Sequence, residues 1–245
     1  MRIFPTPPYK NVPELLDSPG EVSERDLSHT LRDIRRANIF GMGTWVVKHH
    51  LKSILKGVPR EEPLRILDLA TGSGDIPEEL CRWGRRNGYN IRFVLTDISP
   101  AILEVARERI MKAGLGEEFS FSVCDACSAP FDDKEFDVVL CSLALHHLDR
   151  KQAKDVITEM HRLSRRGFVI NDVYRAQGAW LLAWLLTHLT TTNRLTRHDG
   201  PASVLRAFTP REVMRIAERA RVPVKLHTHP FWRMAAVWHG DPNNP

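Results

Sequence analysis

The residues with the clearest chemical meaning surround two glycines, Gly72 and Gly74, in the segment LRILDLATGSGDIP (residues 64–77). Asp68 ends an apolar run typical of a buried strand, and a helical segment follows the glycines. Because glycine has no side chain, the backbone amides of such a turn can approach a ligand closely. An acidic residue stands on each side of the glycines, Asp68 and Asp75. The pattern predicts a binding turn for a ligand that carries positive charge.

Two other kinds of binding turn fit the segment less well. A dinucleotide-binding turn has a third glycine at position 77, for close packing of helix and strand, where this chain has Pro77. A P-loop has Gly-Lys-Ser/Thr after the glycines, where Asp75 and Ile76 stand. A nicotinamide-dependent oxidoreductase is therefore disfavoured, although it stays an alternative class.

Candidate catalytic residues follow two later apolar runs. His146 and His147 come just after the run that ends at Ser142, and Asp172 ends the next run. Histidine titrates near neutral pH and can accept the proton of a hydroxyl group, and a carboxylate can orient it. Each feature also has a structural alternative, a cap on residues 148–154 for the histidines and a helix or turn cap for Asp172.

The elements around these residues predict an α/β fold. After residue 63, short apolar runs alternate with amphipathic segments, which indicates a parallel sheet covered by helices on both faces. Two final runs, joined by a few residues around Pro230, predict an antiparallel hairpin, so the last strand is reversed. The expected strands are 64–69, 91–96, 119–123, 136–142, 168–172, 222–227 and 231–238, and the expected helices are 77–86, 100–113, 151–165 and 210–221.

Two regions flank or interrupt this alternation. Residues 1–60 are predicted to form a helical cap, with helices over 23–40, capped by Ser23, and over 44–56, so that the main domain spans 61–245. Within it, residues 174–207 form an insertion beyond a strand end, where α/β sheets bind ligands.

We expect the insertion to act as a lid that contacts an acceptor substrate. It contains the apolar run AWLLAWLL and then the polar tract TTTNRLTRHDG. Its tryptophans are alternatively a dimer surface, and residues 198–200 are alternatively a simple turn. The predicted substrate contacts are Trp180, Trp184, Arg197, His198 and Asp199.

Composition excludes several classes of protein. The 245 residues are 42% hydrophobic and 27% charged, as in ordinary globular proteins. The net charge of +5 is spread in short groups and does not favour nucleic acid as a partner. The longest apolar run is too short to cross a bilayer, and the N-terminal prolines do not suit a signal peptide, so we expect a cytoplasmic protein without stable membrane insertion. Cys124 and Cys127 form a CxxC without a second pair, so we expect reduced thiols and no metal site.

Four motifs in order resemble the class I S-adenosylmethionine-dependent methyltransferases. They are the acid and GxG of residues 68–74, Asp97 at the end of VLTDIS, Asp125-Ala126 in SVCDACS, and the strand FDVVLCSLALHHL. The ALHHL ending resembles the ubiquinone/menaquinone-type branch. LRDIRRANIFGMG (31–43) and RHDGP (197–201) resemble a subgroup that tailors polyketides or quinones.

The resemblance implies a Rossmann-like methyltransferase sheet and S-adenosylmethionine as cofactor. It implies that Asp97 holds the ribose, that Asp125 lies beside the adenine, and that Asn38, Gly41 and Trp45 close over the cofactor. The implied cofactor residues are Asp68, Ala70, Thr71, Gly72, Ser73, Gly74, Asp97, Ile98, Asp125, Ala126 and Ser142.

The predicted function is methyl transfer to a small hydroxylated, aromatic acceptor such as a polyketide, phenol or quinol. We expect O-methylation, with His146 or His147 as the base and Asp172 as its partner. The alternatives are C-methylation of a quinone precursor, RNA methylation, or a scaffold that binds the cofactor without catalysis. A homodimer is compatible with the sequence.

Overall fold

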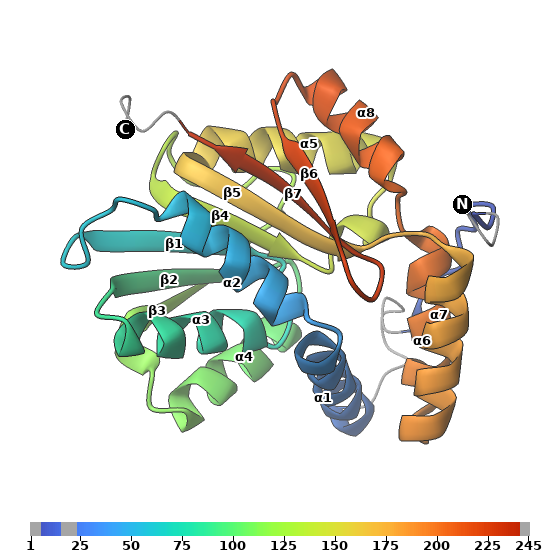
Figure 1. Cartoon of the computed structure of the whole chain (residues 1–245). Helices are drawn as coiled ribbons and strands as arrows, with labels where there is room; N and C mark the ends of the chain where they lie inside the picture. The colour runs from blue at the N-terminus through green and yellow to red at the C-terminus, as the bar shows by residue number, and fades with distance from the viewer. Residues whose placement is uncertain (1–5, 16–23, 241–245) are drawn as a thin grey trace.

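Seven strands form a single sheet in the order β3-β2-β1-β4-β5-β7-β6 (Figure 1). The computed structural model describes residues 6–15 and 24–240. β1 to β5 are mutually parallel, whereas β7 runs antiparallel to both β5 and β6. The strands are β1 (Pro63–Leu69), β2 (Asn90–Asp97), β3 (Phe119–Val123), β4 (Phe136–Ser142), β5 (Ser164–Val173), β6 (Lys225–His229) and β7 (Arg233–His239). The predicted mostly parallel sheet with a reversed last strand is confirmed.

Helices cover both faces of the sheet, as the alternation predicted (Figure 1). Because successive side chains of a strand point to opposite faces, the central strands β1, β4, β5 and β7 contribute to two cores. One core joins the sheet to α2, α3 and α4, and the other joins it to α5 and α8. The helices are α1 (Glu24–Phe40), α2 (Gly43–Ile54), α3 (Asp75–Arg86), α4 (Pro100–Lys112), α5 (Arg150–Leu163), α6 (Gln177–Thr190), α7 (Arg194–Arg206) and α8 (Pro210–Ala220), with short 3-10 turns η2 (Gly116–Glu118) and η3 (Leu145–His147).

The two N-terminal helices pack differently from each other. α2 buries Val46, Val47 and Leu51 in the first core, against the sheet. α1 lies below it and contacts α2 and α7 (Figure 1). The predicted cap therefore contains one helix that is part of the core, and its boundary at residue 60 stays a prediction. Ser23, the expected cap of α1, lies outside the described residues.

Several element boundaries differ from the expected ones. β5 begins at Ser164, four residues early, because Arg165 and Arg166 extend the strand and pair with Asp137 on β4. β6 begins three residues late, because Val222 and Val224 pack beneath α8 before the strand starts.

The insertion forms a helical pair, α6 and α7, that stands beside the sheet (Figure 1). The alternative of a simple turn at residues 198–200 is wrong, because this stretch lies inside α7. Asn193 accepts a hydrogen bond from the Leu195 backbone N–H and so caps the helix. Among the described residues, no helix is both long and apolar enough to cross a membrane.

The strand order locates the place where a ligand can bind. The order reverses between β1 and β4, so the connections leaving these two neighbouring strands diverge. In open α/β sheets, ligands bind in the crevice at the carboxyl ends of the strands at such a point. Residues 70–74, 98–99, 143–147 and the end of β5 all lie along this edge.

Candidate active site at the strand ends

The glycine turn after β1 requires unusual backbone angles. Gly72 and Gly74 have φ of 56° and 69°, which side chains disfavour. A Cβ on Gly74 would also lie 3.2 Å from the side chain of Leu95 on β2. The turn is tied to β2 by a 2.8 Å hydrogen bond from the Thr71 N–H to the Thr96 carbonyl. The glycines therefore allow α3 to start close against the sheet, beside the crevice.

Asp68 is a buried carboxylate with an incomplete set of partners. Its Oδ2 accepts a 2.6 Å hydrogen bond from the Thr71 hydroxyl, while its buried Oδ1 has no hydrogen-bond partner. Burial raises the pKa of Asp68 to about 7, against the Thr71 hydrogen bond and with help from the charges of Asp75 and Asp97. A buried acceptor without a partner is costly, so this oxygen suits a ligand that donates a hydrogen bond or carries positive charge.

Asp97 presents a second carboxylate at the end of β2. It accepts hydrogen bonds from the Gly72 N–H (3.1 Å) and the Ser99 N–H (3.0 Å), which fix its side chain beside the glycine turn. Burial raises the pKa of Asp97, opposed by the N–H groups of Ser99, Gly72 and Ile98 and by the charge of His147. Ile98 is 69% exposed and offers an apolar surface next to this carboxylate.

The remaining predicted cofactor residues lie at neighbouring strand ends. Asp125 accepts a hydrogen bond from the Cys127 N–H and thereby holds its own loop after β3, with Ala126 half-buried beside it. Ser142, at the end of β4, has a buried hydroxyl without a hydrogen-bond partner, and so does the side-chain amide of Asn171 on β5. Unpaired polar atoms on three strands thus face one edge, which fits a polar cofactor bound there.

His146 and Asp172 form a buried pair at the same edge. The His146 ring Nδ1 lies 2.8 Å from Asp172 Oδ1, and the His146 backbone N–H donates to Asp172 Oδ2 at 3.0 Å. The η3 turn that carries the histidine follows Leu143, whose N–H donates to the Asn171 carbonyl on β5. Because an ionised carboxylate only accepts hydrogen bonds, Nδ1 carries the proton and Nε2 is the nitrogen that can accept one.

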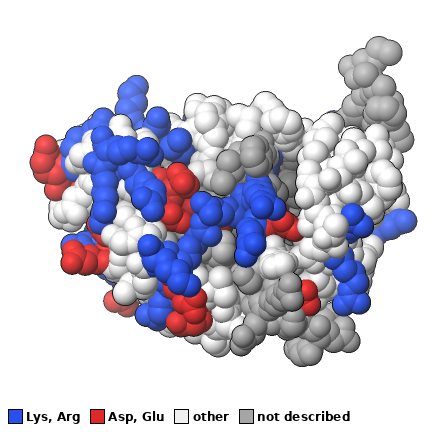
Figure 2. Space-filling view, turned by 90° about the horizontal axis from the view of Figure 1, so that it is seen from below, with Lys and Arg blue, Asp and Glu red and all other residues white. Residues whose placement is uncertain are grey.

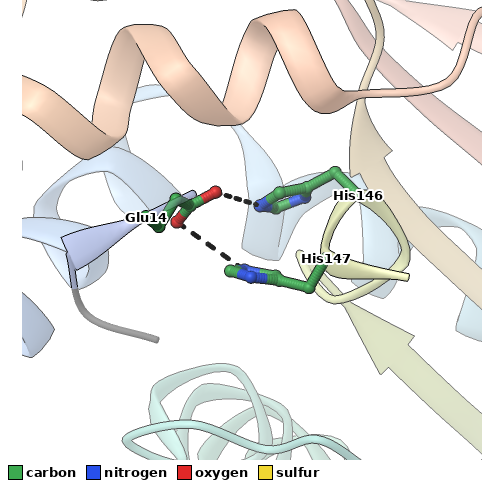
Figure 3. Close-up of side chains that lie close together, drawn as sticks. All are labelled: Glu14, His146 and His147. Carbon is green, nitrogen blue, oxygen red and sulfur yellow. Dashed lines mark ion pairs between the residues drawn. The ribbon is translucent and has the colours of Figure 1, made fainter. Parts of the chain in front are cut away.

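Glu14 faces both histidines from the N-terminal segment (Figure 3). Its Oε1 lies 3.7 Å from His146 Nε2, and its Oε2 lies 3.8 Å from His147 Nε2. The Ser203 hydroxyl donates to Oε1 at 2.9 Å, and Arg206 Nη1 lies 3.8 Å from the same oxygen. A carboxylate from outside the sheet therefore completes the group of acids around the histidine turn.

These neighbours shift the pKa of His146 and Asp172 in opposite directions. Burial lowers the pKa of His146, but the charge and hydrogen bond of Asp172, with Glu14, outweigh it and raise the pKa above its usual value; Arg206 opposes them. Burial raises the pKa of Asp172, but His146 and backbone N–H groups bring it below its usual value. The pair is therefore an imidazole that holds a proton more firmly than usual beside an ionised carboxylate.

Glu14, His146 and His147 also form a possible set of metal ligands, which the sequence did not predict. Their donor atoms all lie within 4.8 Å of one another. Arg206, however, lies against Glu14 and donates to the His147 carbonyl at 3.0 Å. A guanidinium at this distance repels a cation and balances the carboxylates, so the arrangement suits proton transfer better than metal binding.

The residues predicted to contact the acceptor lie in three different places. Trp184 is 42% exposed and stacks on His188, on the outer side of α6. Arg197 donates to the Thr191 and His188 carbonyls and so holds the α6–α7 connection. These contacts give both residues a structural role in the α6–α7 pair, and their predicted contact with the acceptor stays a prediction.

Asp199 and His198 lie nearer to the histidine turn, through the N-terminal segment. Asp199 is buried, accepts from the Leu15 N–H at 2.8 Å and pairs with His198 Nδ1 at 2.8 Å. It therefore anchors the segment that carries Glu14. Trp180 is half-buried on α6, and its predicted contact with an acceptor stays a prediction.

Two of the three residues expected to close over the cofactor contact this end of the sheet. Asn38 Nδ2 donates to Asp75 Oδ2 at 3.1 Å, directly after the glycine turn. The Gly41 carbonyl accepts from Arg233 at the start of β7. Trp45 instead stacks on His49, away from the glycine turn.

Solved structures with the same fold are methyltransferases. Magnesium protoporphyrin IX methyltransferase from Synechocystis superposes with a TM-score of 0.55 at 13% identity, over 92% of this chain and 91% of that one. The O-methyltransferase family 2 protein from Planctomyces limnophilus gives 0.58 at 18% identity, over 91% of this chain and 63% of that one. The fold is therefore the Rossmann-like class I methyltransferase fold.

The central part of the chain also has sequence relatives among methyltransferases. Residues 66–167 match the family described as methyltransferase domain. The ubiquinone/menaquinone biosynthesis C-methyltransferase UbiE of Xanthomonas oryzae is 38% identical over 103 residues, and that of Azotobacter vinelandii is 33% identical over 113. These matches cover 42% and 46% of this chain and 39% and 42% of those proteins, so the chain spans about two fifths of their length. Residues 66–167 are thus similar to a methyltransferase domain, which favours this class over the oxidoreductase alternative.

Proposed function

We propose that the protein transfers a methyl group from S-adenosylmethionine to a hydroxyl group of a small aromatic acceptor. The observation that carries the proposal is the buried Asp172–His146 pair, which lies at the same strand ends as the glycine turn. A proton acceptor beside a cofactor crevice is the arrangement that methylation of a hydroxyl needs.

The cofactor is proposed to bind between the ends of β1, β2 and β4. Asp68, with its unpaired buried oxygen, would hold the ammonium group of the amino-acid part. Asp97 would accept hydrogen bonds from the ribose hydroxyls, while Ile98 and the Asp125 loop would border the adenine. When bound, S-adenosylmethionine supplies a methyl group on a positively charged sulfur.

The protein's own part in the reaction is to position the acceptor and remove its proton. Asp172 holds the His146 ring with Nδ1 protonated, so that Nε2 takes the proton of the acceptor hydroxyl. The positive imidazolium that results is stabilised by Asp172 and by Glu14, which faces Nε2. His147 stacks beside His146 with ring centroids 4.3 Å apart and is the more exposed of the two, so it would contact the acceptor.

Asp97→Ala tests the cofactor site. Loss of a hydrogen-bonding carboxylate should weaken binding of S-adenosylhomocysteine by about 1.5–3 kcal/mol, as measured by titration calorimetry on a folded variant. Unchanged affinity would mean that the cofactor crevice has been assigned to the wrong residues.

C-methylation of a phenolic or quinol acceptor is the second candidate, favoured by the UbiE relatives. A phenol that loses its proton becomes more nucleophilic at carbon as well as at oxygen, so the same base serves both reactions. A panel of hydroxylated aromatic compounds, assayed by mass spectrometry and NMR, distinguishes a methoxy from a ring-methyl product. Exclusive ring methylation would replace the O-methylation proposal and leave the assignment of the base intact.

RNA methylation is the remaining candidate from the sequence. Lys and Arg side chains predominate over the left and centre of the face seen from below, with Asp and Glu among them (Figure 2). Because these acidic side chains interrupt the basic surface, it favours nucleic acid less than an unbroken basic face would.

A further inference from the structure

Five of the eleven histidines gather at a second place, where α2 faces the β6–β7 hairpin. We call this group the hairpin histidine cluster; it consists of His49 and His50 on α2, His227 and His229 on β6, and His239 on β7. Figure 1 shows α2 crossing the sheet toward the tip of that hairpin. The methyl-transfer site uses none of these residues.

The two innermost rings already have the spacing of metal ligands. His50 is 4% exposed, and its Nε2 lies 3.0 Å from His229 Nε2. Two nitrogens bound to one ion at about 2.0–2.1 Å each are separated by about 3 Å when the angle at the metal is near 90°. A tetrahedral ion would need only a few tenths of an ångström more.

A third imidazole, that of His227, lies close by, and its side chain has to turn before its nitrogen can join the other two. His227 and His229 are two residues apart on one strand, so their side chains leave the same face. The ring centroid of His227 lies 4.7 Å from that of His50. His227 is exposed, so water can reach the site and fill the positions that protein does not occupy. His49 instead stacks on Trp45, and His239 contacts the Ser53 hydroxyl.

The chemistry of the ligands selects the ion. Imidazole nitrogen suits zinc, nickel and copper, whereas calcium and magnesium require oxygen ligands. We propose that His50 and His229, completed by His227, form a binding site for a zinc ion. The ion would fasten α2 to the edge of the sheet, close to the loop that joins α1 to α2 and holds the start of β7 through Arg233 and Gly41.

Titration calorimetry with zinc chloride, on protein that carries no polyhistidine tag, tests the proposal. We expect one ion per chain. His229→Gln and His227→Gln, on the exposed edge strand and so with little risk to folding, should each weaken binding by more than about tenfold. His50→Gln should also weaken zinc binding, and circular dichroism would confirm that this variant is folded.

The chain offers a matched control in α6. Trp184 and His188 stack at i, i+4 as Trp45 and His49 do, but outside any group of histidines. His188→Gln should leave zinc affinity unchanged. His147→Gln separates this site from the histidines beside Glu14. The proposal is overturned by lack of zinc binding, by binding that survives His229→Gln, or by binding that is lost in His147→Gln; a simple N–H···N hydrogen bond between His50 and His229 would then explain their distance.

Discussion

The two groups of histidines differ in what surrounds them more than in how deeply they are buried. His146 and His50 are 5% and 4% exposed. Burial lowers the pKa of both, but Asp172 and Glu14 reverse the effect at His146. At His50, burial and then the charges of His227, His229, His49 and His239 all act in one direction and lower the pKa to about 3.

This difference separates two uses of the same side chain. An imidazole between carboxylates can take up a proton and keep the positive charge that results. An imidazole among other imidazoles stays neutral and offers a lone pair, as a metal ligand must. The partner groups, and not the histidines themselves, therefore decide which region suits proton transfer.

The largest expected effect is the loss of kcat on replacing His146, the proposed base. His146→Gln removes the proton acceptor, so kcat should fall by about 10²–10⁴-fold, while affinity for S-adenosylhomocysteine changes little. His50→Gln, an equally buried histidine, should keep kcat within about threefold. Methyl-transfer assays with radiolabelled cofactor measure both. Equal losses in the two variants would show that His146 acts only through the fold.

The gain in stability from zinc should depend on the hairpin histidine cluster and not on His146. An ion that binds only the folded protein stabilises it by about 2.7 kcal/mol at a free concentration one hundred times the Kd. Denaturant unfolding with and without zinc should show this gain in the parent protein and in His146→Gln, and should lose it in His229→Gln. If zinc still stabilised His229→Gln against unfolding, the ion would bind elsewhere, and zinc would no longer distinguish the two groups of histidines.

Asp68 extends the comparison of surroundings to a carboxylate. The neighbouring charges that raise its pKa are those of Asp75 and Asp97. Its pKa of about 7 means that it is protonated below neutral pH and must lose that proton to pair with an ammonium group. Affinity for S-adenosylhomocysteine should therefore fall as the pH drops below 7, by up to about tenfold per unit. Calorimetry across this range measures the slope. Asp68→Asn should bind S-adenosylhomocysteine more weakly, and its affinity should not change with pH in this range. An identical slope in this variant would assign the effect to another group.

The smallest expected effect concerns Glu14. Because the pKa of His146 is raised, its neutral form, and with it the methyl-transfer rate, should increase with pH through a midpoint above about 6.5. Glu14→Gln removes a negative charge that favours the protonated ring, so the midpoint should move to lower pH, by less than about one unit. The pH profile of kcat gives both values. A midpoint that stays in place would show that Glu14 only supports the N-terminal segment.

The sequence predicted what depends on local pattern. Short apolar runs that alternate with amphipathic segments predicted the seven strands and the helices on both faces, and the ends of these runs pointed to Asp97 and Asp172. Glu14 lies in a segment with no periodicity, so nothing local connects it to residues 146 and 147. The polar tract of residues 190–200 left a turn at 198–200 open, because Asp-Gly is a common turn pair, yet residues 194–200 belong to α7. Contacts with the N-terminal segment, such as Asp199 with Leu15, instead accompany its helix.

Glu14 comes from a part of the chain that contributes no strand to the sheet. It precedes residues 66–167, which match the methyltransferase domain family, and its buried side chain contacts Ser203 on α7. Substitution there can change how strongly His146 holds its proton without disturbing strand pairing. In the proposed reaction, changes in this one short N-terminal stretch would fit the base to acceptors of different acidity, a form of tuning that leaves Asp68 and Asp97 unchanged.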